Sequence, residues 1–252
     1  NFTNIHIKNK FFYSLGTPEQ VNIFNHAFLL DLDGTLANTD HIYTKVWKKI
    51  LNEYNVDCSD EFFHSFIKGK SDLSFLRFLI PNISGEKINE ISIMKDALFI
   101  NELNGNILFD GVIKFFDRFQ NSKIAVVTSC NKKSAHFILQ KYNLLDYISL
   151  LIASEDVTNH KPHPEPYLKA IKLLNVEKKN CLILEDSSSG YLAATKTNPL
   201  KVLIYNNKTN INVVNTSQYN FSNYNDLNPQ SIFKSENKTP DDFKNNLLNN
   251  LS

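Results

Sequence analysis

The chain has 252 residues with a formal net charge of +1, and 42% of its residues are hydrophobic. That length suits one α/β core with an insertion, and the near-zero charge shows no nucleic-acid or membrane footprint. Three scattered cysteines favour reduced thiols, and no stretch is long and apolar enough to span a bilayer. We therefore expect a cytoplasmic protein, monomeric or weakly dimeric, without nucleic-acid or membrane partners.

The first predicted core element is a buried strand over residues 27–30, which follows an N-terminal extension, residues 1–26, without an assigned role. Asp31 and Asp33 come directly after the strand, and Gly34 then permits a sharp turn. Carboxylates at the end of a buried strand cost free energy unless something uses their charge. Their spacing of two residues places both on the same side of the strand. The pattern predicts a site for a hard divalent cation, with one carboxylate left for chemistry.

Residues 40–106 change to a helical pattern, in which apolar residues recur at helical spacing. The pattern predicts an all-helical block inserted after the first acidic motif. Phe62, Phe63 and Phe66 belong to this block. We expect these aromatic side chains to lie in its core, because large apolar side chains are more often buried than exposed as a ligand platform.

From residue 108 onward, apolar strands alternate with helices. This alternation predicts an α/β fold with a doubly wound parallel sheet and right-handed crossovers. Beyond residue 205 the chain is polar, and we expect Asp226 and Leu227 to dock back on the core. A C-terminal tail follows over residues 231–252, with a short helix around Phe243 and Leu248. The helices are expected over residues 112–121, 133–142, 164–174 and 190–197, and the strands over 123–127, 148–152, 181–184 and 201–205.

Polar residues stand at or just beyond the ends of these predicted strands. Thr128 and Ser129 follow one strand, Glu185 and Asp186 follow another, and Lys161 lies in a loop between them. In an open α/β sheet, ligands bind at the carboxyl ends of the strands. We therefore expect these residues to meet the first acidic pair in one site.

The chain carries four short motifs in the order Asp31-Leu32-Asp33-Gly34-Thr35, Thr128-Ser129, Lys161-Pro162-His163-Pro164 and Glu185-Asp186-Ser187. They resemble those of the haloacid dehalogenase-like superfamily of phosphotransferases. Within that superfamily the chain is most similar to the branch of β-phosphoglucomutase and the phosphoglycolate-type phosphatases, over residues 27–227. The resemblance implies a Rossmann-like core over residues 27–39 and 107–230, and a helical cap over residues 40–106.

The resemblance also implies a role for each motif residue in a Mg²⁺-dependent phosphoryl transfer. Asp31 is the expected nucleophile, which would form an aspartyl-phosphate, and Asp33 is the expected general acid and base. An all-oxygen ligand set without histidine or cysteine favours Mg²⁺. The expected metal ligands are Asp31, Asp33 through its backbone carbonyl, Asp186, and Glu185 either directly or through water. The expected phosphate-binding residues are Gly34, Thr128, Ser129 and Lys161, of which Lys161 is also catalytic.

The candidate for substrate selection is the cap loop Lys68-Gly69-Lys70-Ser71. The β-phosphoglucomutases carry Lys-Gly-X-Ser-Arg at the matching stretch, whereas here Asp72 replaces the arginine and Tyr43 replaces a hinge histidine. An anion at that place weakens the grip on the second phosphate that a mutase must hold. We therefore predict a phosphatase acting on a small phosphorylated metabolite, a sugar phosphate. A β-phosphoglucomutase-like phosphotransferase and a catalytically silent binding protein are the alternatives.

Overall fold

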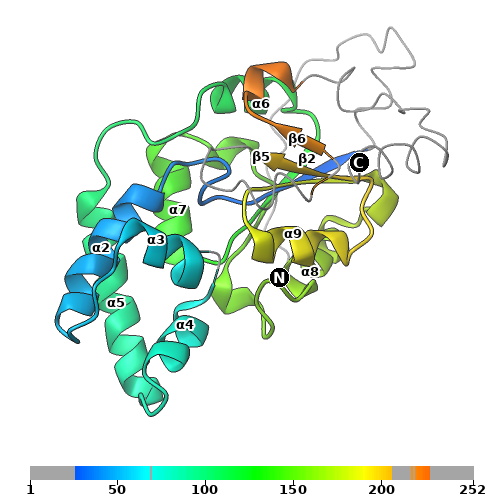
Figure 1. Ribbon diagram of the computed structural model, residues 1–252. Coiled ribbons are helices and arrows are strands. Elements are labelled where there is room, and N and C mark those ends of the chain that lie inside the picture. Colours follow the sequence, from blue (N-terminus) through cyan, green and yellow to red (C-terminus); the bar gives the residue numbers. More distant parts are fainter. Residues whose placement is uncertain (1–25, 69, 206–216, 218, 228–252) are drawn as a thin grey trace, which may run out of the picture.

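The structure is a computed structural model that describes residues 26–68, 70–205, 217 and 219–227. Within these residues, six strands form one parallel sheet in the order β3-β2-β1-β4-β5-β6 (Figure 1). The first acidic motif therefore follows a central strand, at the carboxyl edge that it shares with its neighbours. The strands are β1 (Ala27–Leu30), β2 (Lys123–Val127), β3 (Leu150–Ile152), β4 (Cys181–Glu185), β5 (Lys201–Tyr205) and β6 (Tyr219–Phe221).

Strand β1 is buried on both faces, as its uninterrupted apolar sequence predicts. Phe28 and Leu30 pack into one hydrophobic cluster, and Ala27 and Leu29 pack into a second cluster. Successive side chains of a strand point to opposite faces, so the two clusters lie on the two sides of the sheet.

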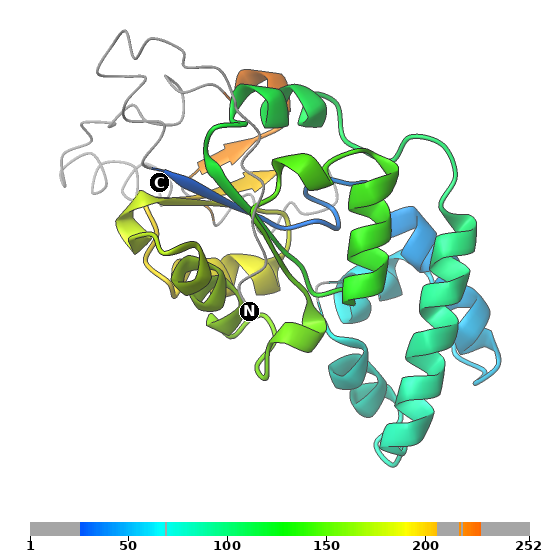
Figure 2. The ribbon, with the colours of Figure 1, turned by 180° about the vertical axis from the view of Figure 1, so that it is seen from behind.

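Helices cover both faces of the sheet (Figures 1 and 2). On one side, α8 (Glu165–Leu174) contacts β2 and β3, and α9 (Ser188–Thr195) contacts β4 and β5. On the other side, α6 (Val112–Arg118) and α7 (Lys132–Lys141) place buried side chains in the cluster that holds Phe28. Short 3₁₀ turns connect the elements: η2 (Leu145–Tyr147), η3 (Ser154–Asp156), η4 (Lys178–Asn180) and η5 (Tyr224–Asp226).

A helical lobe stands beside the carboxyl edge of the sheet, between β1 and α6 in sequence (Figure 1). The chain returns from it to the core beside the place where it left, because the Asn38 N–H donates to the Ile107 carbonyl at 2.7 Å. The predicted fold class, a doubly wound parallel sheet with an inserted helical cap, is therefore confirmed. The lobe consists of α2 (Asp40–Asn52), α3 (Asp60–Phe62), the π-helix η1 (Phe63–Ile67), α4 (Asp72–Leu79) and α5 (Gly85–Glu102).

The expectation that Phe62, Phe63 and Phe66 all lie in the core of the cap is wrong for Phe66. Phe63 is buried, but Phe66 is 38% exposed and its ring stacks on that of the exposed Phe78. The cause is the π-helical turn over Phe63–Ile67, which takes more residues per turn than an α-helix. Residues three apart therefore no longer share one face.

The last described residues return to the core, and of the predicted pair Leu227 is buried there whereas Asp226 is exposed. Tyr224 is fully buried and its hydroxyl donates to the Thr35 carbonyl at 2.7 Å, while Leu227 is 5% exposed. Residues 1–25 of the expected N-terminal extension and the expected helix around Phe243 lie outside the described residues. Among the helices that the structure describes, none is long and apolar enough to cross a membrane.

Candidate active site

A pocket opens between the carboxyl edge of the sheet and the helical cap. Asp31 and Asp33 line it from the loop after β1, and Lys161 lines it beside Asp31. The predicted motif residues thus meet at one place, as expected from their positions at strand ends. The other core residues on its wall are Thr128, Ser129, Cys130, Asp186 and Ser187, and the cap contributes Asp40, Tyr43, Trp47, Phe63, Ile67, Lys68, Lys70, Asp72 and Lys95.

Asp31 and Lys161 form a buried ion pair at the centre of the site. Lys161 Nζ lies 2.6 Å from Asp31 Oδ1 and 2.7 Å from Glu185 Oε1, and it also donates to the Val127 carbonyl at 2.9 Å. Burial alone would lower the pKa of Lys161, but the charges of Asp31 and Glu185 outweigh it and raise that pKa. Lys161 therefore stays cationic beside the carboxylates.

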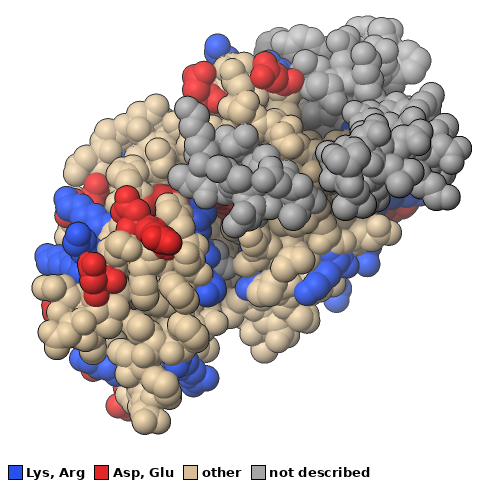
Figure 3. Space-filling model, viewed as in Figure 1, with Lys and Arg blue, Asp and Glu red and all other residues tan. Residues whose placement is uncertain are grey.

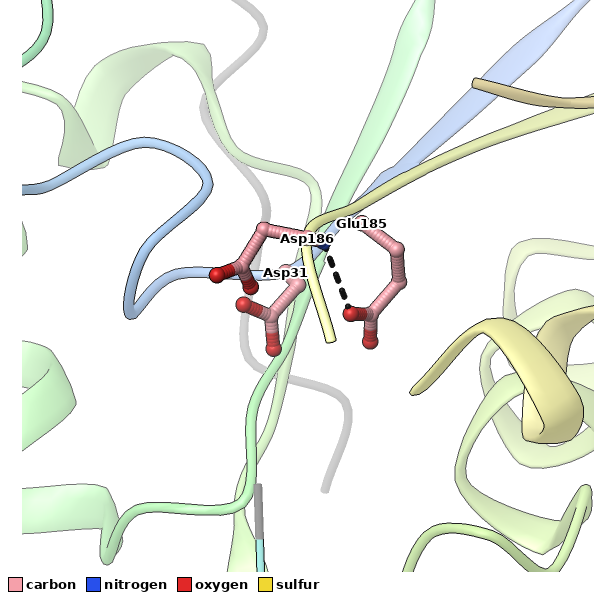
Figure 4. Close-up of side chains that lie close together, drawn as sticks. All are labelled: Asp31, Glu185 and Asp186. Carbon is pink, nitrogen blue, oxygen red and sulfur yellow. Dashed lines mark hydrogen bonds between the residues drawn. The ribbon is translucent and has the colours of Figure 1, made fainter. Parts of the chain in front are cut away.

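Three buried carboxylates, those of Asp31, Glu185 and Asp186, each offer an oxygen within 4.8 Å of the others. Figure 4 shows the carboxylates of Asp31 and Asp186 next to each other, whereas Glu185 folds back so that its Oε2 accepts from the Asp186 N–H. Burial raises the pKa of Asp31 well above its usual range, and the charges of Glu185 and Asp186 add to this against the opposing Lys161. The cluster carries more negative charge than its surroundings balance.

Glu185 is the carboxylate most fully engaged by hydrogen bonds. Its Oε1 accepts from Lys161 and from the Tyr167 hydroxyl at 2.6 Å, and its Oε2 accepts from the N–H and hydroxyl of Ser187 at 3.2 and 3.1 Å. Burial would raise the pKa of Glu185, but the charge and hydrogen bond of Lys161 outweigh it, so this pKa is lowered. Glu185 is thus an ionised partner that anchors Lys161.

Asp186 faces the cap as well as the core. Its Oδ1 accepts from the Thr35 hydroxyl at 3.3 Å, and its Oδ2 lies 2.7 Å from Lys68 Nζ. Burial raises the pKa of Asp186 to about 6, against the opposing charge of Lys68. Gly34 permits this arrangement, because its φ is +81° and a Cβ there would come within 2.2 Å of Asp186 Oδ2.

Asp33 lines the same pocket as Asp31 but has different partners. Its Oδ1 accepts from the Thr39 hydroxyl at 2.8 Å, and its Oδ2 accepts from the Thr128 hydroxyl at 3.3 Å. Burial is the main cause that raises the pKa of Asp33, against the hydrogen bond from Thr39. The two carboxylates of the first motif therefore have different surroundings: Asp31 contacts a lysine, and Asp33 accepts from two hydroxyl groups.

The four predicted cap residues have separate positions. Lys68 bridges Asp186 and Asp40, whose Oδ2 lies 2.6 Å from its Nζ. Lys70 lines the pocket and its Nζ lies 5.7 Å from the centroid of the Phe66 ring. Ser71 caps α4 by accepting from the Ser74 N–H at 3.2 Å and is not part of the pocket wall that the structure describes. Gly69 lies outside the described residues.

Sequence reasoning missed three contributors to this site. Thr39 orients Asp33, Tyr167 holds Glu185, and Lys95 pairs with Asp72 at 2.6 Å on the cap wall. Lys95 gives a signal in the sequence, since it falls on the apolar stripe of its helix. Tyr167 and Thr39 give none, because a tyrosine in an amphipathic helix and a threonine before a helix are ordinary in those places.

The donor set fits a hard divalent cation. The clustered ligand atoms are all carboxylate oxygens, and two of the three carboxyl groups have a raised pKa because they are buried among like charges. Oxygen ligands of this kind suit Mg²⁺. A bound dication would relieve the repulsion that the lysines balance only in part.

Comparisons with known proteins point to one family. A family model described as haloacid dehalogenase-like hydrolase matches residues 28–204. Validoxylamine A 7'-phosphate phosphatase of Streptomyces hygroscopicus subsp. limoneus is 28% identical over 171 residues, 67% of this chain and 80% of that protein. Phosphorylated carbohydrates phosphatase of Thermotoga maritima is 26% identical over 173 residues, 67% of this chain and 79% of that protein. The structure of β-phosphoglucomutase from Clostridium difficile matches with a TM-score of 0.72 at 25% identity, and the match covers 82% of this chain and 95% of that one.

Proposed function

The chain belongs to the haloacid dehalogenase-like hydrolase family, and we propose that it is a Mg²⁺-dependent phosphomonoesterase for a small phosphorylated metabolite. The observation that carries this proposal is the buried Asp31–Lys161 pair, which faces a pocket together with Asp33 and Asp186. These residues provide a nucleophile in Asp31, a cation for the phosphoryl group in Lys161 and a second carboxylate for proton transfer in Asp33.

Asp31 is the proposed nucleophile. One of its carboxylate oxygens attacks the phosphorus, forms an O–P bond and displaces the ester oxygen, which leaves an aspartyl-phosphate. Lys161, held at 2.6 Å from Asp31 Oδ1, is placed to bind the transferring phosphoryl group. Water then attacks the phosphorus, breaks the bond to Asp31 and releases inorganic phosphate. Positioning and charge supply most of the rate in reactions of this kind.

Asp33 is the proposed general acid and base. We expect it to donate a proton to the leaving ester oxygen, and the burial that raises its pKa suits this role as an acid. It then accepts a proton from the water that attacks the aspartyl-phosphate. The hydroxyls of Thr39 and Thr128 fix the orientation of its carboxyl group for both steps.

The phosphate oxygens have further proposed partners on the core side of the pocket. Thr128 and Ser129 line it at the end of β2, together with Asp31, and we expect the Thr128 hydroxyl and the Ser129 N–H to donate to phosphate oxygens. Gly34 leaves room for the Asp186 carboxylate, because a Cβ there would come within 2.2 Å of Asp186 Oδ2. These three residues and Lys161 form the proposed phosphate-binding set.

Asp31, Asp186 and the backbone carbonyl of Asp33 are the proposed direct protein ligands of Mg²⁺. Glu185 acts from behind them, because Lys161, Tyr167 and Ser187 already occupy both of its oxygens. When bound, Mg²⁺ offsets the negative charge of the phosphoryl oxygens. Lys68 and the metal would share Asp186, which links the cap to the metal site.

The substrate is proposed to be a sugar phosphate or a related compound. Two relatives are named for phosphatase action on validoxylamine A 7'-phosphate and on phosphorylated carbohydrates. The likeness to a β-phosphoglucomutase keeps the mutase as the second candidate. Against the mutase stands Asp72, because a carboxylate on the cap wall disfavours a second phosphate there.

The experiment that tests the proposal compares two products from β-glucose 1-phosphate. The enzyme with Mg²⁺ and no bisphosphate primer is expected to release inorganic phosphate from this or another small monophosphate. A mutase would instead form glucose 6-phosphate and would need priming by a bisphosphate or an acyl phosphate. Isomer formation that outpaces phosphate release by a wide margin would establish the mutase, and a failure to hydrolyse any phosphate ester would support a silent binding protein.

A further inference from the structure

Lys95 occupies a core position of the cap helix α5, and its side chain lines the substrate pocket. The buried residues of this helix are Ile88, Ile91, Lys95 and Phe99, which form one stripe at helical spacing. Lys95 is only 5% exposed, yet it shares the pocket wall with Asp31. An apolar residue in this stripe would stabilise the cap at least as well, because a buried ammonium group must be desolvated. Its charge therefore points to a role in binding.

Two carboxylates hold the Lys95 ammonium group in place. Its Nζ lies 2.6 Å from Asp72 Oδ2 and 3.2 Å from Asp96 Oδ1. Burial would lower the pKa of Lys95, but the charges of Asp72 and Asp96 outweigh it and raise that pKa. The group stays charged, and the three side chains together carry one negative charge. Asp72 also lines the pocket, with its side chain 22% exposed, so it can still accept a hydrogen bond.

Two other lysines of the pocket wall, the buried Lys161 and the partly buried Lys68, also pair with carboxylates. Lys161 pairs with two of them in the core, and Lys68 pairs with Asp40 and Asp186. The remaining lysine of the described wall, Lys70, is exposed and lies over the Phe66 ring. At Lys68, Lys95 and Lys161, a second phosphate or a carboxylate on the substrate would therefore have to displace an existing ion pair, at the cost of leaving a carboxylate unpaired.

We infer that the Asp72–Lys95 pair binds the non-reacting part of the substrate, and that this part is an uncharged, hydroxylated group. The pair offers one acceptor and one donor side by side, which suits neighbouring hydroxyl groups. Tyr43 lines the same pocket, and its ring provides apolar surface for the carbon face of such a group. The inference rests on the proposed phosphatase function and narrows its substrates to monophosphates of polyols and sugars.

The first test is a panel of phosphate esters with Mg²⁺. It contains hexose, pentose and glycerol monophosphates, their bisphosphates, phosphoglycolate as a phosphorylated acid, and p-nitrophenyl phosphate, which carries no hydroxyl groups. The best neutral hydroxylated monophosphate is expected to exceed every bisphosphate and phosphoglycolate at least tenfold in kcat/KM. A best substrate that is a bisphosphate, phosphoglycolate or the aryl ester would overturn the inference, whereas no hydrolysis of any ester would overturn the proposed function itself.

Two variants test the pair directly, because they change its charge in opposite directions. Asp72→Asn removes the net negative charge of the three side chains Asp72, Lys95 and Asp96. It is expected to raise the ratio of kcat/KM for the bisphosphate to kcat/KM for the monophosphate about tenfold. Lys95→Met makes the group more negative and is expected to lower that ratio. It should also raise KM for the preferred monophosphate about tenfold, with a smaller change in kcat, because a ground-state contact is lost.

The control is Lys87→Met, the same substitution at an exposed position of the same helix. It is expected to leave the ratio unchanged. General damage to the cap would move both pocket variants in the same direction, so ratios that shift together, or not at all, would overturn the inference. If Lys95→Met does not fold, the gain expected for Asp72→Asn still decides the question, since a damaged cap does not gain a new substrate.

Discussion

Asp31 is the residue on which the proposed chemistry depends, and its surroundings offer no replacement. Glu185 is engaged by Lys161, Tyr167 and Ser187, and Asp33 is held by two hydroxyls. We expect Asp31→Asn to reduce phosphatase activity by several orders of magnitude, as for other groups that act as a unit in catalysis. The fold should persist, because asparagine has the same shape as aspartate. Its amide also removes the repulsion between Asp31 and the neighbouring carboxylates of Glu185 and Asp186.

The measurement is phosphate release by the purified variant, with circular dichroism and a melting curve as checks of folding. Asp57→Asn is the matched control, since Asp57 is an exposed acid in the cap. A folded Asp31→Asn enzyme that keeps more than a small fraction of wild-type activity would show that another residue is the nucleophile.

Gly190 has no side chain, and this leaves room for the carboxylate of Glu185. A Cβ at this position would come within 1.8 Å of Glu185 Oε1, so an alanine would force the Glu185 carboxylate away from Lys161. Breaking a buried ion pair in this way costs about 3–5 kcal/mol, so Gly190→Ala should lower the free energy of unfolding by roughly that amount. Gly85→Ala is the control, because a Cβ there meets nothing within 4 Å.

Urea unfolding of the two variants beside the wild type measures both effects. In the first turn of α5, Gly85→Ala is expected to be neutral or to stabilise by up to about 1 kcal/mol, since alanine favours the helix and restricts the unfolded chain. Equal stability of the two variants would mean that Glu185 can move aside freely.

The motif residues of the site could be predicted from the sequence because each follows a strand directly or lies in a loop beside one. Asp31, Thr128 and Asp186 are brought together by the parallel sheet alone. The pair Asp72 and Lys95 could not be predicted, because its members lie 23 residues apart on two helices whose packing the sequence does not specify. The contact between Lys68 and Asp186 could not be predicted either, because the sequence does not specify how the cap packs against the core.

At the scale of elements, three helices of the cap, α3, α4 and α5, begin at a serine whose hydroxyl accepts a hydrogen bond from the first turn. Ser84 lies before α5, and its hydroxyl accepts from the Lys87 N–H at 3.1 Å. We expect Ser84→Ala to lower the free energy of unfolding by about 1 kcal/mol, because the first turn loses a hydrogen-bond acceptor. Ser92→Ala, in the interior of the same helix, is the control and should stabilise by up to about 0.5 kcal/mol.

Thermal or urea unfolding compares the two serine variants under the same conditions. Each variant removes one serine hydroxyl, from the N-cap of α5 or from its interior. A difference in stability between them therefore measures the N-cap hydrogen bond of Ser84. Two variants with equal stability would show that solvent replaces the Ser84 contact without loss.

Helices and strands were predictable where their apolar period is strong, and less so at their ends. The predicted strand over 201–205 agrees with β5, whereas the helix predicted over 112–121 ends at Arg118 and the strand predicted over 148–152 begins at Leu150. Phe119, the first residue after α6, is fully buried beside Phe28. Tertiary packing of this kind outweighs the local preference of a few residues at an element's end.

At the scale of the whole molecule, the cap and the core meet through charged side chains around the pocket. Lys68 reaches from the cap to Asp186, and α5 contacts α7, which follows Thr128 and Ser129. The face seen in Figure 3 shows acidic and basic side chains interspersed over the cap, in keeping with the near-zero net charge of the chain. Binding at the pocket therefore acts on both parts of the molecule at once.

Activity should require Mg²⁺ and should be inhibited by Ca²⁺. The clustered carboxylates come from two strand ends, β1 and β4, so a metal that binds the folded chain should also raise its Tm. Ca²⁺ is larger and takes more ligands, and we expect it to bind Asp31 in a way that spoils the geometry of its attack. Both ions should therefore raise the Tm, whereas only Mg²⁺ should support phosphate release. A titration of each ion after treatment with chelator measures both quantities, and full activity in excess chelator or with Ca²⁺ alone would contradict the proposed carboxylate site.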